Sequence, residues 1–313
     1  MFTAHDFRAA RRGALTALAI GNFDGVHRGH RHLIDRVKDA ARALGGESVA
    51  LTFDPHPTRV LAPDRASPLV VGLDRKLELL AETGVDATVV QRFDLSFASQ
   101  SPLEFAEHVV LGLRAREVFV GEDFRFGRNR EGNGATLVAL GAQLGFRAHV
   151  VTPLEEGAIP VSSSRVRRAL ADGDLGLAKL LLGRDYDLDG LVITGHRRGR
   201  TLGFPTANLA TECEALPRDG VYAVRVTVLG PDGPKDHPAV MNLGSRPTFR
   251  AGRSLEAHLL DADVDLYGRT LRVTFAARLR DERRFDGIDA LRAQITADVA
   301  AARAALDTWE RTT

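Results

Sequence analysis

The sequence contains little lysine, little cysteine and no long apolar run. Four of its 42 basic residues are lysine, namely Lys38, Lys76, Lys179 and Lys235. Arginine, histidine, backbone N–H groups and metal would therefore carry most contacts to any phosphate. The single cysteine, Cys213, excludes an internal disulfide and is typical of a reducing compartment. No stretch reaches the roughly 18 apolar residues that span a bilayer, and a net charge of +1 indicates no polyanionic partner. We therefore expect a cytoplasmic protein that binds neither membranes nor nucleic acids.

The two commonest phosphate-binding motifs are also missing. No GxxxxGK[ST] segment occurs, and no glycines are spaced as GxGxxG. Instead, an apolar run at 14–20 is predicted to form a buried strand, and it leads into GNFDGVHRGH at 21–30. Apolar residues then recur at helical spacing until Gly45-Gly46. The pattern indicates a strand, a glycine-rich turn and a helix, and the start of a helix suits bound phosphate.

Two histidines distinguish this turn. His27 and His30 are three residues apart, so we expect them in the first helical turn, on one face. From there the imidazoles could donate hydrogen bonds to triphosphate oxygens and stabilise charge on departing pyrophosphate. Gly21, Gly25 and Gly29 would let the backbone approach a nucleotide. This is the HxGH pattern of nucleotidyl transfer, which we favour over a simple turn with two surface histidines.

The pattern of predicted elements divides the 313 residues into two domains. Strand-like and helix-like segments alternate in the first half, which predicts a doubly wound domain with a parallel sheet at 1–184. Short strands follow in 185–313, spaced as in a barrel or sandwich, and a final helix is predicted at 288–308. The predicted strands are 48–53, 87–90, 117–120, 147–151, 188–194, 220–229, 239–242, 254–260 and 270–279; the other predicted helices are 75–83, 102–113, 135–144 and 175–182. Residues 231–234 have the composition of a hairpin loop.

Three loops near predicted strand ends could hold ligands. The two prolines beside His56 predict a loop without regular structure after the strand that ends at Phe53. In the Gly121–Gly127 segment, Phe124 beside Asp123 could hold a flat aromatic ligand, although a hydrophobic loop anchor is the simpler interpretation. The serines at 162–164 are ordinary helix N-caps or, together with Arg167, part of a triphosphate site.

A second candidate site lies in the C-terminal half. Thr206 and Asn208 would face one side if their segment is extended, and both offer neutral oxygen ligands that Mg²⁺ accepts beside phosphate and water. The preceding segment is rich in glycine and arginine, and the later NLGSRPTF segment at 242–249 has a similar composition. Glu256 stands on a mostly apolar strand as either a surface residue or a base in a pocket. Its spacing alone favours the surface.

Together these segments resemble the bifunctional riboflavin kinase/FMN adenylyltransferase family of bacteria, also called FAD synthetase. The resemblance runs from Leu15 to Leu306 and includes GNFDGVHRGH, FDPHP, VGEDFRFG, SSSRVR, GRTLGFPTANL, GVYA, NLGSRPTF and LEAHLLD. Other nucleotidyltransferases share part of the first motif. GFPTAN followed by NLGSRPTF and a strand glutamate is much more specific to riboflavin kinase.

The resemblance implies two reactions. In the C-terminal barrel, riboflavin and ATP would give FMN and ADP, with Glu256 as the base for the ribityl hydroxyl and Thr206 and Asn208 as Mg²⁺–ATP ligands. This overturns the assignment of Glu256 from spacing alone. In the N-terminal domain, FMN and a second ATP would give FAD and pyrophosphate, with His27 and His30 stabilising the transferring α-phosphate.

The resemblance also implies binding roles for further residues. The expected nucleotide-binding residues are Gly21, Phe23, Asp24, Gly25, Gly29, Ser163, Ser164, Arg167, Gly195, Arg200 and Gly203; the expected flavin-binding residues are Phe53, His56, Asp123, Phe124 and Arg246. Two positions depart from the family pattern. Ser164 replaces the usual threonine and keeps its hydroxyl, whereas Asp123 replaces a frequent asparagine and loses a hydrogen-bond donor.

Three alternatives remain open at this point. A nucleotidyltransferase of another substrate class, such as a cytidylyltransferase, explains HxGH but leaves the second half without a role. A class I aminoacyl-tRNA synthetase would need a lysine-rich loop that four lysines do not provide. A flavin-binding regulator would predict loss of the histidines or of Glu256, and all three are present. The sequence does not indicate an oligomeric state.

Overall fold

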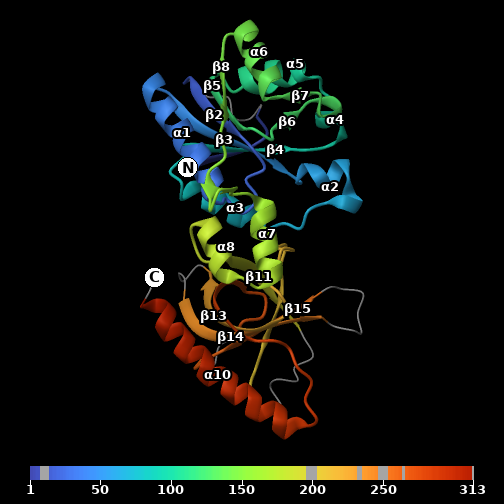
Figure 1. Ribbon diagram of the computed structural model, residues 1–313, viewed down its shortest axis with the longest axis vertical. Helices are drawn as coiled ribbons and strands as arrows, with labels where there is room; N and C mark the ends of the chain where they lie inside the picture. Colours follow the sequence, from blue (N-terminus) through green and yellow to red (C-terminus); the bar gives the residue numbers. More distant parts are fainter. Residues whose placement is uncertain (8–13, 195–202, 231–234, 246–252, 263–264, 312–313) are drawn as a thin grey trace. The chain divides into compact units, whose positions relative to one another are not determined.

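The computed structural model describes residues 1–7, 14–194, 203–230, 235–245, 253–262 and 265–311. The chain forms two compact units (Figure 1). The first comprises Met1–Pro68 and Leu73–Ser163, and the second comprises Leu69–Gly72 and Ser164–Thr313. The helices before residue 184 cluster with the second unit. The expected domain boundary at 184/185 stays a prediction.

The first unit is built on a six-stranded parallel sheet with the strand order β1-β4-β3-β2-β5-β8. Its strands are β1 (Phe2–His5), β2 (Thr16–Ile20), β3 (Glu47–Asp54), β4 (Ala87–Arg92), β5 (Ala115–Gly121) and β8 (Arg147–Val151). All five residues of β2 are buried, as expected for a central parallel strand covered on both faces. The predicted doubly wound architecture is confirmed. Strand β1 was missed because it is a short edge strand with one buried residue.

Helices cover both faces of this sheet (Figure 1). The helices of this unit are α1 (Arg28–Leu44), α2 (Pro57–Leu61), α3 (Leu73–Ala81), α4 (Leu95–Ala98), α5 (Pro102–Phe105) and α6 (Gly134–Leu144), with short 3₁₀ turns η1 (Pro63–Arg65) and η3 (Arg128–Arg130). Helix α1 ends at Gly45, whose left-handed backbone has a φ of +60°, as the sequence predicts. The helix predicted at 102–113 is instead α5 followed by a π-helical segment η2, Ala106–Leu111.

Strand order places the GNFDGVHRGH motif at a special position. The chain runs from β2 through β3 to β4 on one side, and β5 then pairs with the other side of β2. The order therefore reverses at β2, and ligands of open α/β sheets bind beyond the carboxyl ends of strands at such a point. The motif follows directly from the carboxyl end of β2.

The second unit contains helix α7 (Ser163–Asp172) from its second residue onward, helix α8 (Leu175–Leu182) and a closed barrel with the strand order β11-β12-β15-β14-β13-β16. The strands are β11 (Asp187–Ile193), β12 (Ala207–Ala210), β13 (Gly220–Leu229), β14 (Lys235–Ser245), β15 (Arg253–Leu259) and β16 (Thr270–Arg280). The sequence left barrel and sandwich open, and the barrel is correct. The expected hairpin loop 231–234 lies outside the described residues, between the antiparallel partners β13 and β14.

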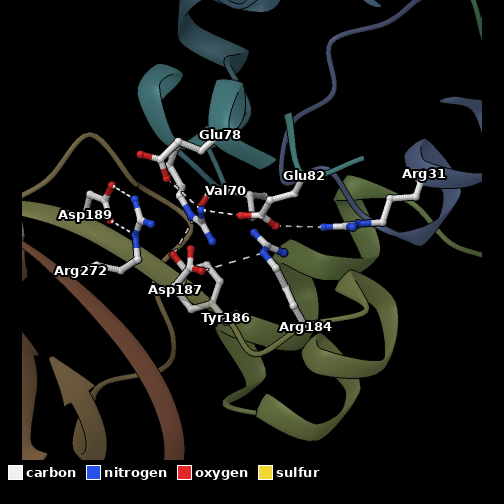
Figure 2. Close-up of polar contacts among 10 residues, drawn as sticks. Arg31, Val70, Glu78, Glu82, Arg184, Tyr186, Asp187, Asp189 and Arg272 are labelled. Atoms are coloured by element: carbon white, nitrogen blue, oxygen red, sulfur yellow. Dashed lines mark hydrogen bonds and ion pairs between the residues drawn. The ribbon is translucent and has the colours of Figure 1, made fainter. Parts of the chain in front are cut away.

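Side-chain hydrogen bonds and the packing of one helix stabilise the barrel. Arg272 on β16 donates two 2.7 Å hydrogen bonds to Asp189, its partner on β11 (Figure 2). The buried Tyr186 donates from its hydroxyl to the carbonyl of Ala215 at 3.1 Å. Helix α10 (Ile288–Glu310) packs Ala302 and Leu306 against β13, β14 and β16.

Candidate active sites

The turn after β2 has an unusual backbone. Its first residue, Gly21, donates its N–H to the carbonyl of Leu51 on β3 at 3.1 Å. Phe23 and Val26 are fully buried, yet both have positive φ values, +49° and +40°. Bulky residues rarely adopt this conformation, and such strain clusters at functional sites. The turn is thus a rigid structure held by its buried side chains.

The two histidines lie together, but not as expected. His27 is the N-cap of α1 rather than a residue of its first turn, and its Nδ1 accepts the backbone N–H of His30 at 3.3 Å. The two rings stack with centroids 3.6 Å apart and an interplanar angle of 16°. Because Nδ1 accepts, neutral His27 carries its proton on Nε2. The cap therefore fixes one imidazole as a donor at the positive end of a helix.

Space is tight around two glycines of the motif. A Cβ on Gly29 would lie 3.1 Å from both the His27 ring and the carbonyl oxygen of Val161, and a Cβ on Gly21 would lie 3.2 Å from the Phe23 ring. Gly25 instead has a φ of +81°, which suits glycine. Residues 21–30 thus follow a backbone path that larger residues would disturb.

The serine segment contacts this turn. Ser163, the first residue of α7, donates its hydroxyl to the carbonyl of Asp24 at 3.0 Å. Asp24 is 1% exposed. Ser164 and Arg167 follow Ser163 on α7 and cluster with the second compact unit, so their expected contacts to a triphosphate stay predictions.

A buried lysine near the motif was missed by the sequence analysis. Lys76 on α3 is 4% exposed. Burial lowers the pKa of its ammonium, and the charges of Asp24 and Asp54 oppose that shift. One of the four lysines thus lies close enough to the carboxylate of the motif for the two groups to interact electrostatically. No signal in the sequence could have found it, because only folding brings α3 to Asp24.

The expected loop at His56 is wrong in part. His56 is 8% exposed and is the N-cap of α2, its Nδ1 accepting the N–H of Thr58 at 3.3 Å. Pro57 begins that helix, since proline needs no N–H bond partner in a first turn. The two prolines therefore mark a helix start. The prediction that His56 follows a strand end is confirmed, because β3 ends at Asp54.

The expected flavin-binding phenylalanines belong to one row of rings. Phe53 packs against Phe93 and Phe97 with centroids 5.7 and 6.0 Å apart. Phe124 stacks on Phe126 at 5.2 Å and 16°, and Phe126 is 6% exposed. Phe124 is thus a partly exposed ring on a hydrophobic anchor, which accommodates both interpretations of this loop. Asp123 beside it is exposed.

The residues of the second candidate site form a row across three strands. Asn208 on β12 lies directly opposite Glu256 on β15, and Glu256 lies directly opposite Asn242 on β14. Leu255 and Ala257, the neighbours of Glu256, are buried inside the barrel, so the row lies on the outer face. Glu256 therefore lies on the outer surface of the barrel, as its spacing predicts. The catalytic role that the resemblance implies stays a prediction for a residue at this surface.

Residues beside this row were not predicted. Asn242 donates from Nδ2 to Glu282 at 3.2 Å, and a Cβ on Gly244 would collide with the Glu282 carboxylate. His258, two residues after Glu256 on the same face, lies with Nδ1 2.7 Å from the carbonyl oxygen of Pro205. The motif LEAHLLD contains this histidine, so its spacing of two from Glu256 could have revealed it.

Thr206 and Asn208 could supply only part of the coordination shell of a magnesium ion. Within the described ranges no three His, Cys, Asp or Glu residues gather as a metal site. Thr206 and Asn208 offer two neutral oxygens opposite a carboxylate, and Mg²⁺ completes such sets with phosphate and water. Gly203 precedes them with a φ of +86°. The expected nucleotide and flavin contacts at Gly195, Arg200 and Arg246 lie outside the described residues.

Comparisons with known proteins match both halves of the chain. A family model described as FAD synthetase matches residues 10–165, and one described as riboflavin kinase matches residues 182–306. A bifunctional riboflavin kinase/FMN adenylyltransferase of Escherichia coli (strain K12) is 43% identical over 288 residues, 91% of this chain and 91% of that protein. Proteins of the same description are 40% identical in Pseudomonas fluorescens, over 96% of this chain and 95% of that one, and 37% identical in Bacillus subtilis (strain 168), over 91% and 90%.

A solved structure has the same fold. It is described as a macrolide-efflux protein from Streptococcus pneumoniae, with a TM-score of 0.83, 29% identity, and coverage of 97% of this chain and 99% of that one. Macrolide efflux is part of the description of that protein and is not carried over to this chain. In the part of this chain that the structure describes, no helix is long and apolar enough to cross a membrane. With two family models in order and relatives similar over nine-tenths of its length, the chain belongs to the bifunctional riboflavin kinase/FMN adenylyltransferase family.

Proposed function

We propose that FMN adenylylation takes place at the GNFDGVHRGH turn, with His27 and His30 as the residues that stabilise the transferring α-phosphate. The observation that carries this proposal is the capping bond from His30 N–H to His27 Nδ1, which leaves His27 Nε2 as a hydrogen-bond donor. A donor fixed before the substrate binds needs no reorganisation when charge develops on phosphate oxygens. FMN phosphate attacks the α-phosphorus of ATP, and pyrophosphate leaves.

The remaining residues of this turn bind the nucleotide. Gly21, Gly25 and Gly29 let the backbone come close to phosphate, and Phe23 and Asp24 form the buried support of the turn. Ser163 donates a hydrogen bond to the backbone carbonyl of Asp24 in that support. Ser164 and Arg167 bind the triphosphate, as the resemblance implies. Phe53, His56, Asp123 and Phe124 bind the flavin of FMN, with Phe124 offering a partly exposed ring as a stacking surface.

Riboflavin phosphorylation takes place at the outer face of the barrel. Glu256 removes the proton of the ribityl 5′-hydroxyl, whose oxygen then attacks the γ-phosphorus of ATP and displaces ADP. The direct pairing of Asn208 with Glu256 supports this assignment, because it places an oxygen ligand for metal beside the base. Mg²⁺ held by Thr206 and Asn208 would neutralise charge on the phosphates. Gly195, Arg200 and Gly203 contact the nucleotide, and Arg246 contacts the flavin.

A cytoplasmic location is part of the same proposal. It is supported by the use of ATP as co-substrate in both reactions and by the single cysteine of the chain.

The test separates the two sites within one chain. The variant His27→Asn keeps an N-cap oxygen but removes the Nε2–H donor, and Glu256→Gln keeps the size of the side chain but removes the base. Each protein is incubated with Mg²⁺, ATP and either riboflavin or FMN, and the flavins are followed by chromatography. We expect H27N to form FMN without FAD, and E256Q to form FAD only from supplied FMN. Loss of both activities in either folded variant would contradict the assignment.

A further inference from the structure

His258 holds the segment that precedes β12. Its Nδ1 lies 2.7 Å from the carbonyl oxygen of Pro205. A carbonyl oxygen only accepts hydrogen bonds, so Nδ1 must carry the proton. This donor is present in both the neutral and the protonated ring, and Nε2 is left as the second ring nitrogen. The tautomer of His258 is therefore fixed by its contact with the main chain.

The same ring also packs on the neighbouring residue. The Phe204 ring meets the His258 ring edge-on, with centroids 5.5 Å apart and an interplanar angle of 85°. One side chain of β15 thus contacts two consecutive residues, Phe204 through its ring and Pro205 through its carbonyl.

The hydrogen bond from His258 to Pro205 holds this segment where no backbone pairing between β12 and β15 is present. The ladder between β12 and β15 begins with Ala207 opposite Ala257, and residues 203–206 belong to no strand. Pro205 has no N–H to donate. Within the described ranges, the bond from His258 is the only one shown to join 204–206 to β15. Thr206 and His258 each stand one residue beyond the last pair of that ladder, Ala207 with Ala257.

We infer that His258 is a positioning residue of the riboflavin kinase site, which holds the Phe204–Thr206 segment so that the Thr206 hydroxyl faces the metal–nucleotide complex. The inference rests on the proposed role of Thr206. His258 stands on the outer face of β15 beside Glu256, and Asn208 stands across from Glu256. Without the ring, the two residues before Thr206 would lose their attachment to the strand that carries the base.

One competing role for His258 can be distinguished by pH. The imidazole is two residues from Glu256 on the same face, so its Nε2 could itself remove a proton from substrate. A catalytic base would impose its own ionisation on the kinase pH–rate profile. A positioning residue would not, because the Nδ1–H donor persists through that ionisation.

The experiment compares three variants of the full chain. His258→Ala removes both contacts. His258→Asn places an amide N–H where Nδ1 was and should recover most of the hydrogen bond. His237→Ala is the matched control, since His237 is a partly buried histidine on β14 of the same barrel. Binding of Mg·ADP is measured by calorimetry, riboflavin phosphorylation by chromatography, and folding of the barrel by urea unfolding.

We expect H258A to bind Mg·ADP about tenfold more weakly, which corresponds to about 1.4 kcal/mol, with a raised KM for Mg·ATP and little change in kcat. H258N should recover most of this loss, and H237A should match the native protein. The pH–rate profile of H258N should keep its shape. Loss of one limb of the pH–rate profile in H258N would identify His258 as a catalytic base. Unchanged Mg·ADP binding in H258A would overturn the inference.

A double variant separates this inference from the assignment of Thr206. If His258 acts through Thr206, then Thr206→Ala with His258→Ala should bind Mg·ADP no more weakly than Thr206→Ala alone. Additive losses would show that His258 acts on something else. If Thr206→Ala alone changes nothing, the proposed ligand set is wrong, whatever His258 does.

Discussion

Asn208 and Glu256 are direct partners in the antiparallel pair of β12 and β15, although they are far apart in the chain. Side chains on directly opposite residues of an antiparallel pair project to the same face within contact distance. The barrel therefore brings an amide oxygen and a carboxylate together by strand register, without a dedicated loop.

Asn208→Leu removes the amide oxygen and should lower riboflavin phosphorylation by about 100-fold, because misplacing one group at a reacting centre costs this order of rate. Asn208→Asp keeps an oxygen and should lose less, although its charge opposes Glu256. Riboflavin phosphorylation is measured over a range of Mg²⁺ concentrations. FAD formation from FMN should be unchanged in both, and a native rate in the leucine variant would refute the assignment.

Gly29→Ala tests the histidine pair. The added methyl group would lie 3.1 Å from the His27 ring and from the Val161 carbonyl oxygen, so the ring must move. We expect FAD formation to fall at least tenfold, about 1.4 kcal/mol in the transition state, with FMN formation unaffected. Gly176→Ala is the matched control, because its Cβ would meet only Asp174 at an ordinary 3.5 Å. Equal rates in both variants would contradict the tight packing of the motif.

Glu117 should make the first unit sensitive to acid. Burial disfavours its charged form, but hydrogen bonds from Arg147 and His149 outweigh burial, so the pKa of Glu117 is lowered. A carboxyl group with a lower pKa when folded contributes stability above its unfolded pKa and loses it as pH falls through the folded value. Glu117→Gln should therefore lower the urea midpoint at pH 7, and the difference should shrink below about pH 4.

The control for this experiment is Glu155→Gln, which changes an exposed glutamate of the same unit. It should match the native protein at each pH. A midpoint difference for Glu117→Gln that stayed constant with pH would show that shape, rather than charge, accounts for it.

Asp298 should be a main attachment of α10. Its buried carboxylate accepts two hydrogen bonds from Arg280 on β16, at 2.8 and 2.6 Å, and one from Gln294 at 2.7 Å. Asp298→Ala leaves the Arg280 guanidinium without its partner carboxylate, which should lower the free energy of unfolding of the barrel by about 3 kcal/mol. Urea unfolding measures this. Asp307→Ala, at an exposed position of the same helix, should cost little, and equal losses would argue against the ion pair.

The periodic segments were predictable because their burial is local and regular. The spacing of apolar residues located β2, α1, β13 and β8 within a residue or two, since each must turn one face or both to a core. Sheet edges and helix starts were not predictable in this way. The short strand β1 carries too few buried residues to show a pattern, and Pro57 begins a helix where proline was expected to exclude one.

The sequence by itself determined the family, the two motif sets and the chemistry of their residues, because these depend on residue type and short spacing. The tertiary structure decided which groups face one another. It made His27 a cap with a defined tautomer, buried Lys76 beside Asp24, and set Asn208, Glu256 and Asn242 in one row. Register and packing join residues that are distant along the chain, and no local pattern of side chains records those distances.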